Sequence, residues 1–312
     1  MQILDAVIES AWTQRLVKRQ TGQVKGGRMA DAARPTIRGR RLGSELRRLR
    51  EAADKSTEDA ASILKCSRAK ISRVETGSVG IRRLDLGILL DFYGVTQAET
   101  RRTLEDLARD SRKRGWWQDY GDSIPSAYAD FIDLEGEARY IRTWEPILIP
   151  GLLQTEAYTR AVLHANPASI RFGQIEQFVK IRADRKAVLT GDSPVRFSAI
   201  IWEPALHCAF GGREAHQEQL RHLVEMGQCP NVTIQVVPLS VGATAGTSGA
   251  FVLFSFTDSP MPGAVFLESL TSSHYLEEPA ELDSYGMVFD FLRSSALNPD
   301  ESLNTIAALA AM

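Results

Sequence analysis

The sequence predicts an α+β protein in two parts: an all-α bundle of five helices, followed by an α+β domain with a mainly antiparallel sheet. Apolar residues recur at helical spacing in the first part, whereas the second adds short alternating runs between turn residues. The two parts also differ in charge. Residues 1–115 hold 25 Lys and Arg against 15 Asp and Glu, whereas the remaining 197 residues hold 12 Lys and Arg against 24 Asp and Glu. We therefore expect one domain over residues 38–112 and a second over residues 116–312.

Composition excludes several classes of protein. The 312 residues are 44% apolar and 24% charged, as in ordinary globular proteins. No stretch approaches the ~20 apolar residues of a membrane span, so no membrane partner is expected. Three cysteines without metal-ligand spacing fit reduced thiols in the cytoplasm, with no metal and no cofactor. Residues 1–37 are expected to be a disordered tail or, for the part ahead of Met29, a mis-called start.

Five short helices account for the basic part. Apolar residues at i, i+4, i+7 and i+11 mark the first helix: Leu42, Leu46, Leu49 and Ala53. Ser56 and Ser67 are typical N-cap residues for the second and third helices, and Gly77 is typical of the residue that follows a helix. A fourth helix is expected over residues 84–92, and the capping-box pattern of residues 96–99 begins a fifth.

The second and third helices, over residues 57–64 and 67–76, have the dimensions of a helix-turn-helix. Ile71 and Val74 are expected to face the core. The residues that then project outward are Ser67, Arg68, Lys70, Ser72 and Arg73. Such a helix enters the major groove of double-stranded DNA, where arginine binds guanine through two hydrogen bonds. A solvated basic face without a ligand is the alternative, and these residues alone do not decide between the two.

Residues 41–95 resemble the XRE family of helix-turn-helix regulators, most closely within residues 46–50 and 67–77. The resemblance implies two kinds of DNA contact, to bases and to phosphates at helix starts. The base-facing residues are Arg68, Ala69 and Arg73, and the phosphate-contacting residues are Thr57 and Ser67.

The resemblance also implies a buried ion pair, formed by Arg50 and Glu75, that ties the first helix to the third. Lys65 departs from the family, which usually has glycine in the turn of the motif. A left-handed lysine costs roughly 1–2 kcal/mol, so we expect a strained or slightly reshaped turn.

Further arginines flank the motif. Arg38, Arg40 and Arg41 precede the expected first helix, where they form either an arm that reaches the adjacent minor groove or phosphates, or a disordered tail. Arg82 and Arg83 follow the third helix and are placed to contact phosphate.

The acidic part mixes helices and strands. Helices are expected over residues 155–164, 175–189 and 214–227, and strands over residues 195–199, 232–238, 250–256, 264–268 and 274–276. Two helices close the chain, and Asn298 caps the second of them. Strands that cluster between helices favour an α+β domain.

This part resembles the C-terminal domain of WhiJ-like and antitoxin-like regulators from actinobacteria. The resemblance spans residues 115–310, and its most specific pieces are residues 140–146, 149–158, 232–238, 249–251 and 275–276. It implies a regulator of development or secondary metabolism that often works with a small protein encoded nearby. It implies no known ligand and no reaction.

Two W-E-P tripeptides supply candidate contacts for a ligand or a partner: Trp144, Glu145, Trp202 and Glu203. Structural packing of the tryptophans is the alternative. The glycine-rich stretch over residues 240–249 is either a flexible connection between strands or an anion cradle. The sequence holds no P-loop, nucleophile elbow or zinc-protease spacing, so we expect no catalytic residues and no enzyme.

These observations favour a sequence-specific DNA-binding transcription regulator that binds a double-stranded operator as a homodimer. The C-terminal domain is expected to dimerise, to sense an unidentified small-molecule effector, or to hold a partner protein. The alternative is an antitoxin-like protein that sequesters a small partner and regulates its own operon.

Overall fold

The computed structural model describes residues 37–110, 116, 120, 124–165, 174–242, 245–256, 263–269 and 272–312. The expected N-terminal tail lies outside these residues except for Ile37, and the expected boundary at 112–116 lies outside them except for Trp116. Within the described part of the chain, no helix is both long and apolar enough to cross a membrane.

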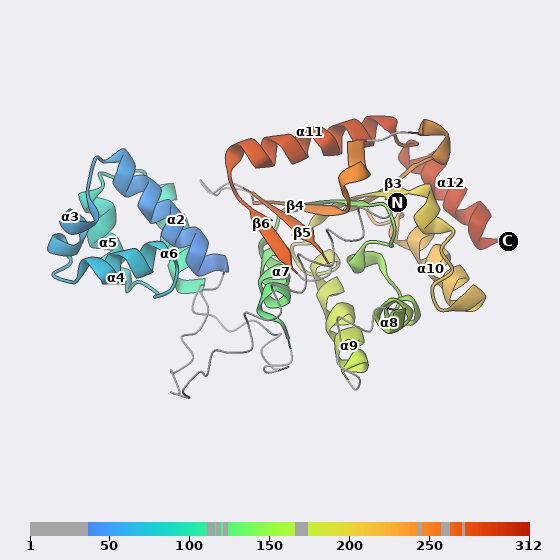
Figure 1. Cartoon of the computed structure of the whole chain (residues 1–312), viewed down its shortest axis with the longest axis horizontal. Coiled ribbons are helices and arrows are strands. Elements are labelled where there is room, and N and C mark those ends of the chain that lie inside the picture. The colour runs from blue at the N-terminus through green and yellow to red at the C-terminus, as the bar shows by residue number, and fades with distance from the viewer. Residues whose placement is uncertain are drawn as a thin grey trace, which may run out of the picture. The chain divides into compact units, whose positions relative to one another are not determined.

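The N-terminal bundle contains the five expected helices (Figure 1), which are α2 (Ile37–Ala52), α3 (Thr57–Ile63), α4 (Arg68–Glu75), α5 (Arg83–Phe92) and α6 (Ala98–Asp110). Their apolar stripes meet in one core, whose most deeply buried members are Leu46, Ala60, Ile71, Leu86, Leu90 and Leu104. Two details differ from expectation. Helix α2 begins five residues before Leu42, and Leu84 is 81% exposed, because Leu86 takes the buried position on α5.

Left-handed residues set the turns of this bundle. Lys65 has a φ of 50°, which confirms the left-handed lysine expected between α3 and α4. Gly77 ends the α4 segment with a φ of 72°. A Cβ atom on Gly77 would lie 2.4 Å from the backbone nitrogen of Arg40, so both the φ angle and the close approach of the two backbones require glycine.

The C-terminal part forms a six-stranded sheet in the order β3-β2-β1-β4-β5-β6. The strands are β1 (Tyr140–Glu145), β2 (Arg196–Trp202), β3 (Val232–Val237), β4 (Phe251–Ser255), β5 (Ala264–Glu268) and β6 (Ser273–Leu276). The pairs β1–β4, β4–β5 and β5–β6 are antiparallel, whereas β1–β2 and β2–β3 are parallel. The α+β class is confirmed and the sheet is mixed, because helical crossovers join β1 to β2 and β2 to β3.

Helices cover both faces of this sheet (Figure 1). Helix α11 (Pro279–Ser295) lies along one face, and the others surround the opposite face. These others are α7 (Ser126–Glu137), α8 (Glu156–Ala165), α9 (Ile175–Arg185), α10 (Gly212–Met226) and α12 (Pro299–Ala310). As expected, Asn298 caps α12, and its Oδ1 accepts a hydrogen bond from the backbone N–H of Glu301 at 2.9 Å.

Strand alternation divides the apolar residues between two cores. On β1, Trp144 belongs to the core under α11, together with Phe289 and Leu292 of that helix. Ile141 points to the opposite face and belongs to the larger core. Because side chains alternate along a strand, Thr143 and Glu145 share the face of Ile141.

Candidate nucleic-acid interface and an internal cavity

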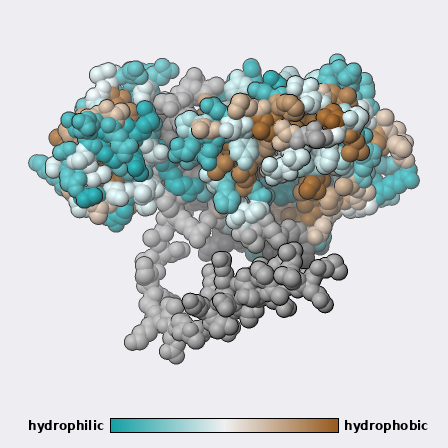
Figure 2. Space-filling model, turned by 45° about the horizontal axis from the view of Figure 1, so that its top comes forward, coloured by the Kyte–Doolittle hydropathy of each residue, from teal (hydrophilic) through white to brown (hydrophobic). Residues whose placement is uncertain are grey.

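Helix α4 is held firmly at its start and along its inner face. The Ser67 hydroxyl accepts a hydrogen bond from the backbone N–H of Lys70 at 3.2 Å, which is the expected N-cap. Ile71 and Val74 are 1% and 4% exposed, so they fix the rotation of the helix about its axis. The visible surface of the bundle, at the left of Figure 2, is mainly hydrophilic.

Four of the expected contact residues lie on the outer face of α4, where they are exposed: Arg68, Ala69, Ser72 and Arg73. Arg68 pairs with Glu58 of α3, with Nη1 and Oε1 2.8 Å apart. Arg73 folds back and its Nε donates to the backbone carbonyl of Ala69 at 3.3 Å. Exposed pairs of this kind contribute only about 0–1 kcal/mol, so both guanidinium groups are available to a polyanion.

Lys70 differs from these four residues. Its side chain is half-buried and its Nζ lies 3.3 Å from Oδ2 of Asp85 on α5. This ion pair joins α4 to α5, so the structure gives Lys70 a contact within the bundle.

The expected phosphate contacts lie near two helix starts. Ser67 is the exposed N-cap of α4. Thr57 is the first residue of α3, and the cap itself is Ser56, which forms a capping box with Asp59. Arg82 and Arg83 are exposed at the start of α5, and Arg83 pairs with Glu105 at 2.9 Å.

The three arginines before Leu42 do not form an extended arm. Arg38, Arg40 and Arg41 lie within α2, because the helix begins at Ile37. Arg38 and Arg41 both pair with Glu137. Burial lowers the pKa of Arg41 to about 10, although the nearby Glu277 opposes the shift. Their assignment to DNA stays a prediction, and their present contacts are with carboxylates.

The expected ion pair between α2 and α4 is present. Arg50 donates from Nε to Oε1 of Glu75 at 2.7 Å and from Nη2 to Oε2 at 3.1 Å. Its Nη1 also donates to the backbone carbonyl of Lys55 at 2.8 Å. The hydrogen bonds with Glu75 raise the pKa of Arg50 above its ordinary value despite burial.

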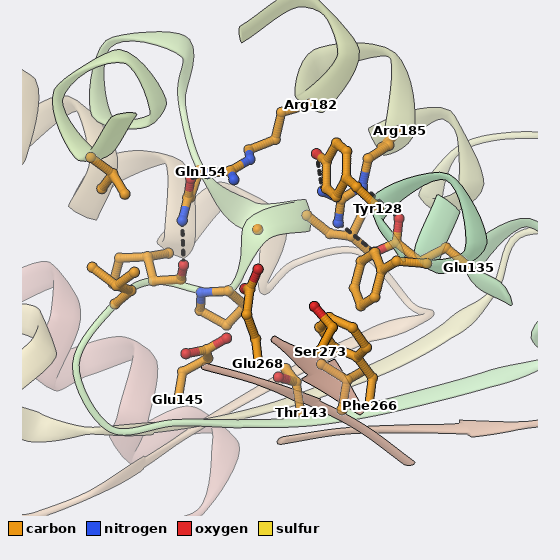
Figure 3. A pocket seen from close by; sticks show the side chains of 18 of the residues that line it. Tyr128, Glu135, Thr143, Glu145, Gln154, Arg182, Arg185, Phe266, Glu268 and Ser273 are labelled. Carbon is orange, nitrogen blue, oxygen red and sulfur yellow. Dashed lines mark hydrogen bonds and ion pairs between the residues drawn. The ribbon is translucent and has the colours of Figure 1, made fainter. Parts of the chain in front are cut away.

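A cavity of about 540 Å³ lies in the C-terminal domain on the sheet face opposite α11. Strands β1, β2, β4, β5 and β6 line one side, and α7, α8, α9 and the short 3-10 turn η2 (Gly151–Leu153) line the other. Figure 3 shows Tyr128, Glu135 and Arg185 at one end, and Gln154, Arg182, Glu145 and Glu268 at the other. The cavity is therefore polar at both ends and apolar between them.

Only one residue of the two W-E-P tripeptides lines this cavity, and it is Glu145. The Trp144 indole donates to the backbone carbonyl of Gly246 at 2.9 Å, and a Cβ on Gly246 would lie 2.3 Å from that ring. Trp202 packs against the core under α11. Glu203 accepts a hydrogen bond from the backbone N–H of Leu239 at 2.6 Å. These contacts explain Trp144, Trp202 and Glu203 as structural residues.

The contact with Trp144 also bears on the glycine-rich stretch. Its described residues, 240–242 and 245–249, include parts of two short 3-10 turns, Leu239–Val241 and Ala245–Ser248. Gly246 is buried against Trp144, so this part of the loop is anchored to the sheet.

Most of the residues that line the cavity were not singled out in the sequence as functional, among them Gln154, Arg182 and Arg185. Gln154 belongs to the run over residues 149–155 that carried the family resemblance, and that run builds one wall of the cavity. Its Oε1 accepts from Nη1 of Arg182 at 2.8 Å. The sequence could not predict this contact, because Gln154 follows η2 and Arg182 lies on α9, so no regular spacing in the sequence relates the two residues.

Arg185 and Glu135 form a buried, two-bond ion pair at the other end of the cavity. Both nitrogen–oxygen distances are 2.7 Å, and the side chains are 5% and 3% exposed. Nη1 of Arg185 also donates to the Tyr128 hydroxyl at 2.7 Å. Burial alone would lower the pKa of Arg185, but Glu135 and Tyr128 raise it above its ordinary value.

A helix-turn-helix whose second helix is capped and exposed is typical of DNA-binding regulators. Residues 41–104 match a family model described as a helix-turn-helix domain, so this chain is a DNA-binding regulator of that class. Residues 128–308 match a model described as "Domain of unknown function (DUF5753)". Since this match covers more than half of the chain, the protein belongs to the DUF5753 family. The comparisons with curated proteins and with solved structures gave no match.

Proposed function

We propose that the protein is a sequence-specific transcription regulator of the XRE type, and that α4 reads the major groove of its operator. The observation that carries this proposal is the outer face of α4, where Arg68 and Arg73 are exposed while Ile71 and Val74 fix the helix from within. Arginine at such positions discriminates guanine from other bases by ~1–3 kcal/mol. The proposed activity is binding, without catalysis.

The protein binds as a homodimer in this proposal, with each α4 in one half-site of a pseudo-palindromic operator. A dimer that neutralises roughly eight phosphates gives a slope of about −7 for log K against log salt concentration. Thr57, Ser67 and Arg82 supply part of this sequence-independent attraction.

Fluorescence anisotropy with DNA from upstream of the protein's own gene tests the proposal. Arg68→Ala and Arg73→Ala should relax sequence preference, whereas Arg82→Ala should weaken binding to all sequences alike. Arg293→Ala is the matched control, because it removes one exposed arginine from a surface pair on α11. A uniform loss of affinity in the Arg68→Ala and Arg73→Ala variants would contradict base reading by α4.

A second candidate is the antitoxin-like function, in which the C-terminal domain sequesters a small partner protein. One observation favours it. Met287 and Phe291 of α11 are 68% and 56% exposed, and Figure 2 shows apolar residues gathered on the visible face of the larger domain. A small protein that copurifies at fixed stoichiometry, and is lost in a Met287→Lys/Phe291→Lys variant, would support this function.

A further inference from the structure

We propose that the cavity in the C-terminal domain binds an organic monocation. Its ammonium group would lie between Glu145 and Glu268, and its apolar body would lie along the apolar wall that includes Phe178, Phe197 and Phe266. This inference goes beyond DNA binding. It concerns a different part of the chain and is tested without DNA.

The topology of the sheet brings the two carboxylates to one edge. Glu145 is the last residue of β1 and Glu268 is the last residue of β5. Both strands run antiparallel to β4, which lies between them, so their C-terminal ends lie at the same edge of the sheet. Both side chains line the cavity (Figure 3).

Glu145 is half-buried at this end of the cavity, whereas Glu268 is exposed there. Arg182 of α9 is the cation close to Glu145. Arg185 is not available, because it is paired with Glu135 through two hydrogen bonds at the far end of the cavity. A monocation between Glu145 and Glu268 would be attracted by both carboxylates.

A proton on Glu145 competes with a cation for this position. Burial raises the pKa of Glu145 to about 8, and Glu268 adds to the rise while Arg182 opposes it. Tyr158 of α8 is the other titratable group that senses Glu145, and burial raises its pKa to about 12, so it stays neutral. A cation that binds near neutral pH must therefore displace the proton of Glu145.

The middle of the cavity suits an apolar body. Thr143, Val252 and Phe266 form one cross-strand row on β1, β4 and β5, and all three line the cavity. Phe178 of α9 and Phe197 of β2 complete an apolar wall. A volume of about 540 Å³ falls in the range that holds small organic ligands.

An anion is the rival ligand, and Arg182 is the reason to test it. Its Nε is buried and has no hydrogen-bond partner among the described residues, so it can donate to a ligand. An anion there would lie close to Glu268 and Glu145, and both carboxylates would repel it. The same Nε can instead donate to a neutral acceptor on a cationic ligand.

Isothermal titration calorimetry on the full chain separates these cases with three probes of one shape: tryptamine, tryptophol and indolepropionate. Tryptamine should bind, and the other two should bind at least tenfold more weakly. Its affinity should rise about tenfold from about pH 7 to about pH 9, because Glu145 loses its proton in this range while the amine keeps its own. Buffers of different ionisation enthalpy should report release of ~0.9 proton per ligand at about pH 7.

Two variants complete the experiment. Glu145→Gln keeps the shape of the protonated side chain, and should lower tryptamine affinity at least tenfold at about pH 9 and abolish proton release. Glu203→Gln in the second W-E-P tripeptide is the matched control, and should bind as the wild type does. Arg182→Gln should bind tryptamine as tightly as the wild type or more tightly, because it removes a like charge.

Three results would overturn the proposal. The first is tighter binding of indolepropionate than of tryptamine, with the binding lost in Arg182→Gln, since that identifies an anion site. The second is tryptamine binding that Glu145→Gln leaves unchanged, and the third is no binding of tryptamine at either pH. Operator binding is not measured in any of these titrations, so the failure of one proposal does not affect the other.

Discussion

Arg50 and Glu75 join helices α2 and α4 through two hydrogen bonds of 2.7 and 3.1 Å, and both side chains are more than nine-tenths buried. The pair connects α2 to the helix that we propose reads DNA. The pair therefore fixes α4 against α2.

Glu75→Gln should destabilise the helical bundle by about 3–5 kcal/mol, because the Arg50 guanidinium keeps its charge in a buried site without its anion. Urea unfolding followed by circular dichroism measures this loss. The double variant Arg50→Met/Glu75→Leu should be more stable than Glu75→Gln, since it removes both charges. Glu51→Gln, at an exposed carboxylate on α2, should change stability by less than about 0.5 kcal/mol.

Lys65→Gly should stabilise the protein by about 1 kcal/mol. The left-handed φ of 50° costs a side-chain-bearing residue roughly 1–2 kcal/mol, and the greater chain entropy of glycine in the unfolded state offsets part of this gain. Thermal unfolding measures the change. Lys180→Gly, within α9, is the matched control and should destabilise by about 1 kcal/mol. Equal effects at the two positions would contradict strain at Lys65.

Glu58→Ala should strengthen DNA binding. The Glu58 carboxylate holds Arg68 at 2.8 Å and would face the phosphates of a bound duplex, so its removal frees the arginine and removes a repulsion. A surface pair of this kind contributes about 0.2–1 kcal/mol, which corresponds to a gain of up to about fivefold in affinity. Anisotropy at low salt measures the gain, and Asp290→Ala, in a similar exposed pair on α11, should leave affinity unchanged. Weaker binding by Glu58→Ala would show that the carboxylate orients Arg68 for the bases.

Stability should fall as pH rises because of Glu145. Its pKa in the folded chain is raised to about 8, above the ordinary value of about 4.3, so the folded state binds this proton more tightly than the unfolded state. The contribution is fully present below about pH 4 and is lost as pH rises to about 8. Glu145→Gln removes this dependence, so its melting temperature relative to wild type should increase from about pH 5 to about pH 8. Parallel curves for the two proteins would show that Glu145 titrates normally.

Much of the helical bundle could be predicted from the sequence because its signals are local. Ser67 and Gly77 are cap and terminator residues, and their effects depend on neighbours a few positions away. The positions of Ile71 and Val74 at helical spacing also predicted which face of α4 is buried, and hence that Arg68 and Arg73 are exposed. Helix α2 began earlier than expected, since Arg38, Arg40 and Arg41 carry no apolar stripe of their own.

In the C-terminal domain, the sequence by itself determined many of the elements and their limits, because the alternation of residues within a strand and the cap at Asn298 are local patterns. It gave no residue range for α7 or for β1. Only the tertiary structure decided that the sheet is mixed, since strand order depends on pairing between distant segments. Only it placed Glu145 near Glu268 and Arg182, which lie on three different elements. A sequence records which groups are charged, but burial and neighbouring charges set their pKa, and both arise when the chain folds.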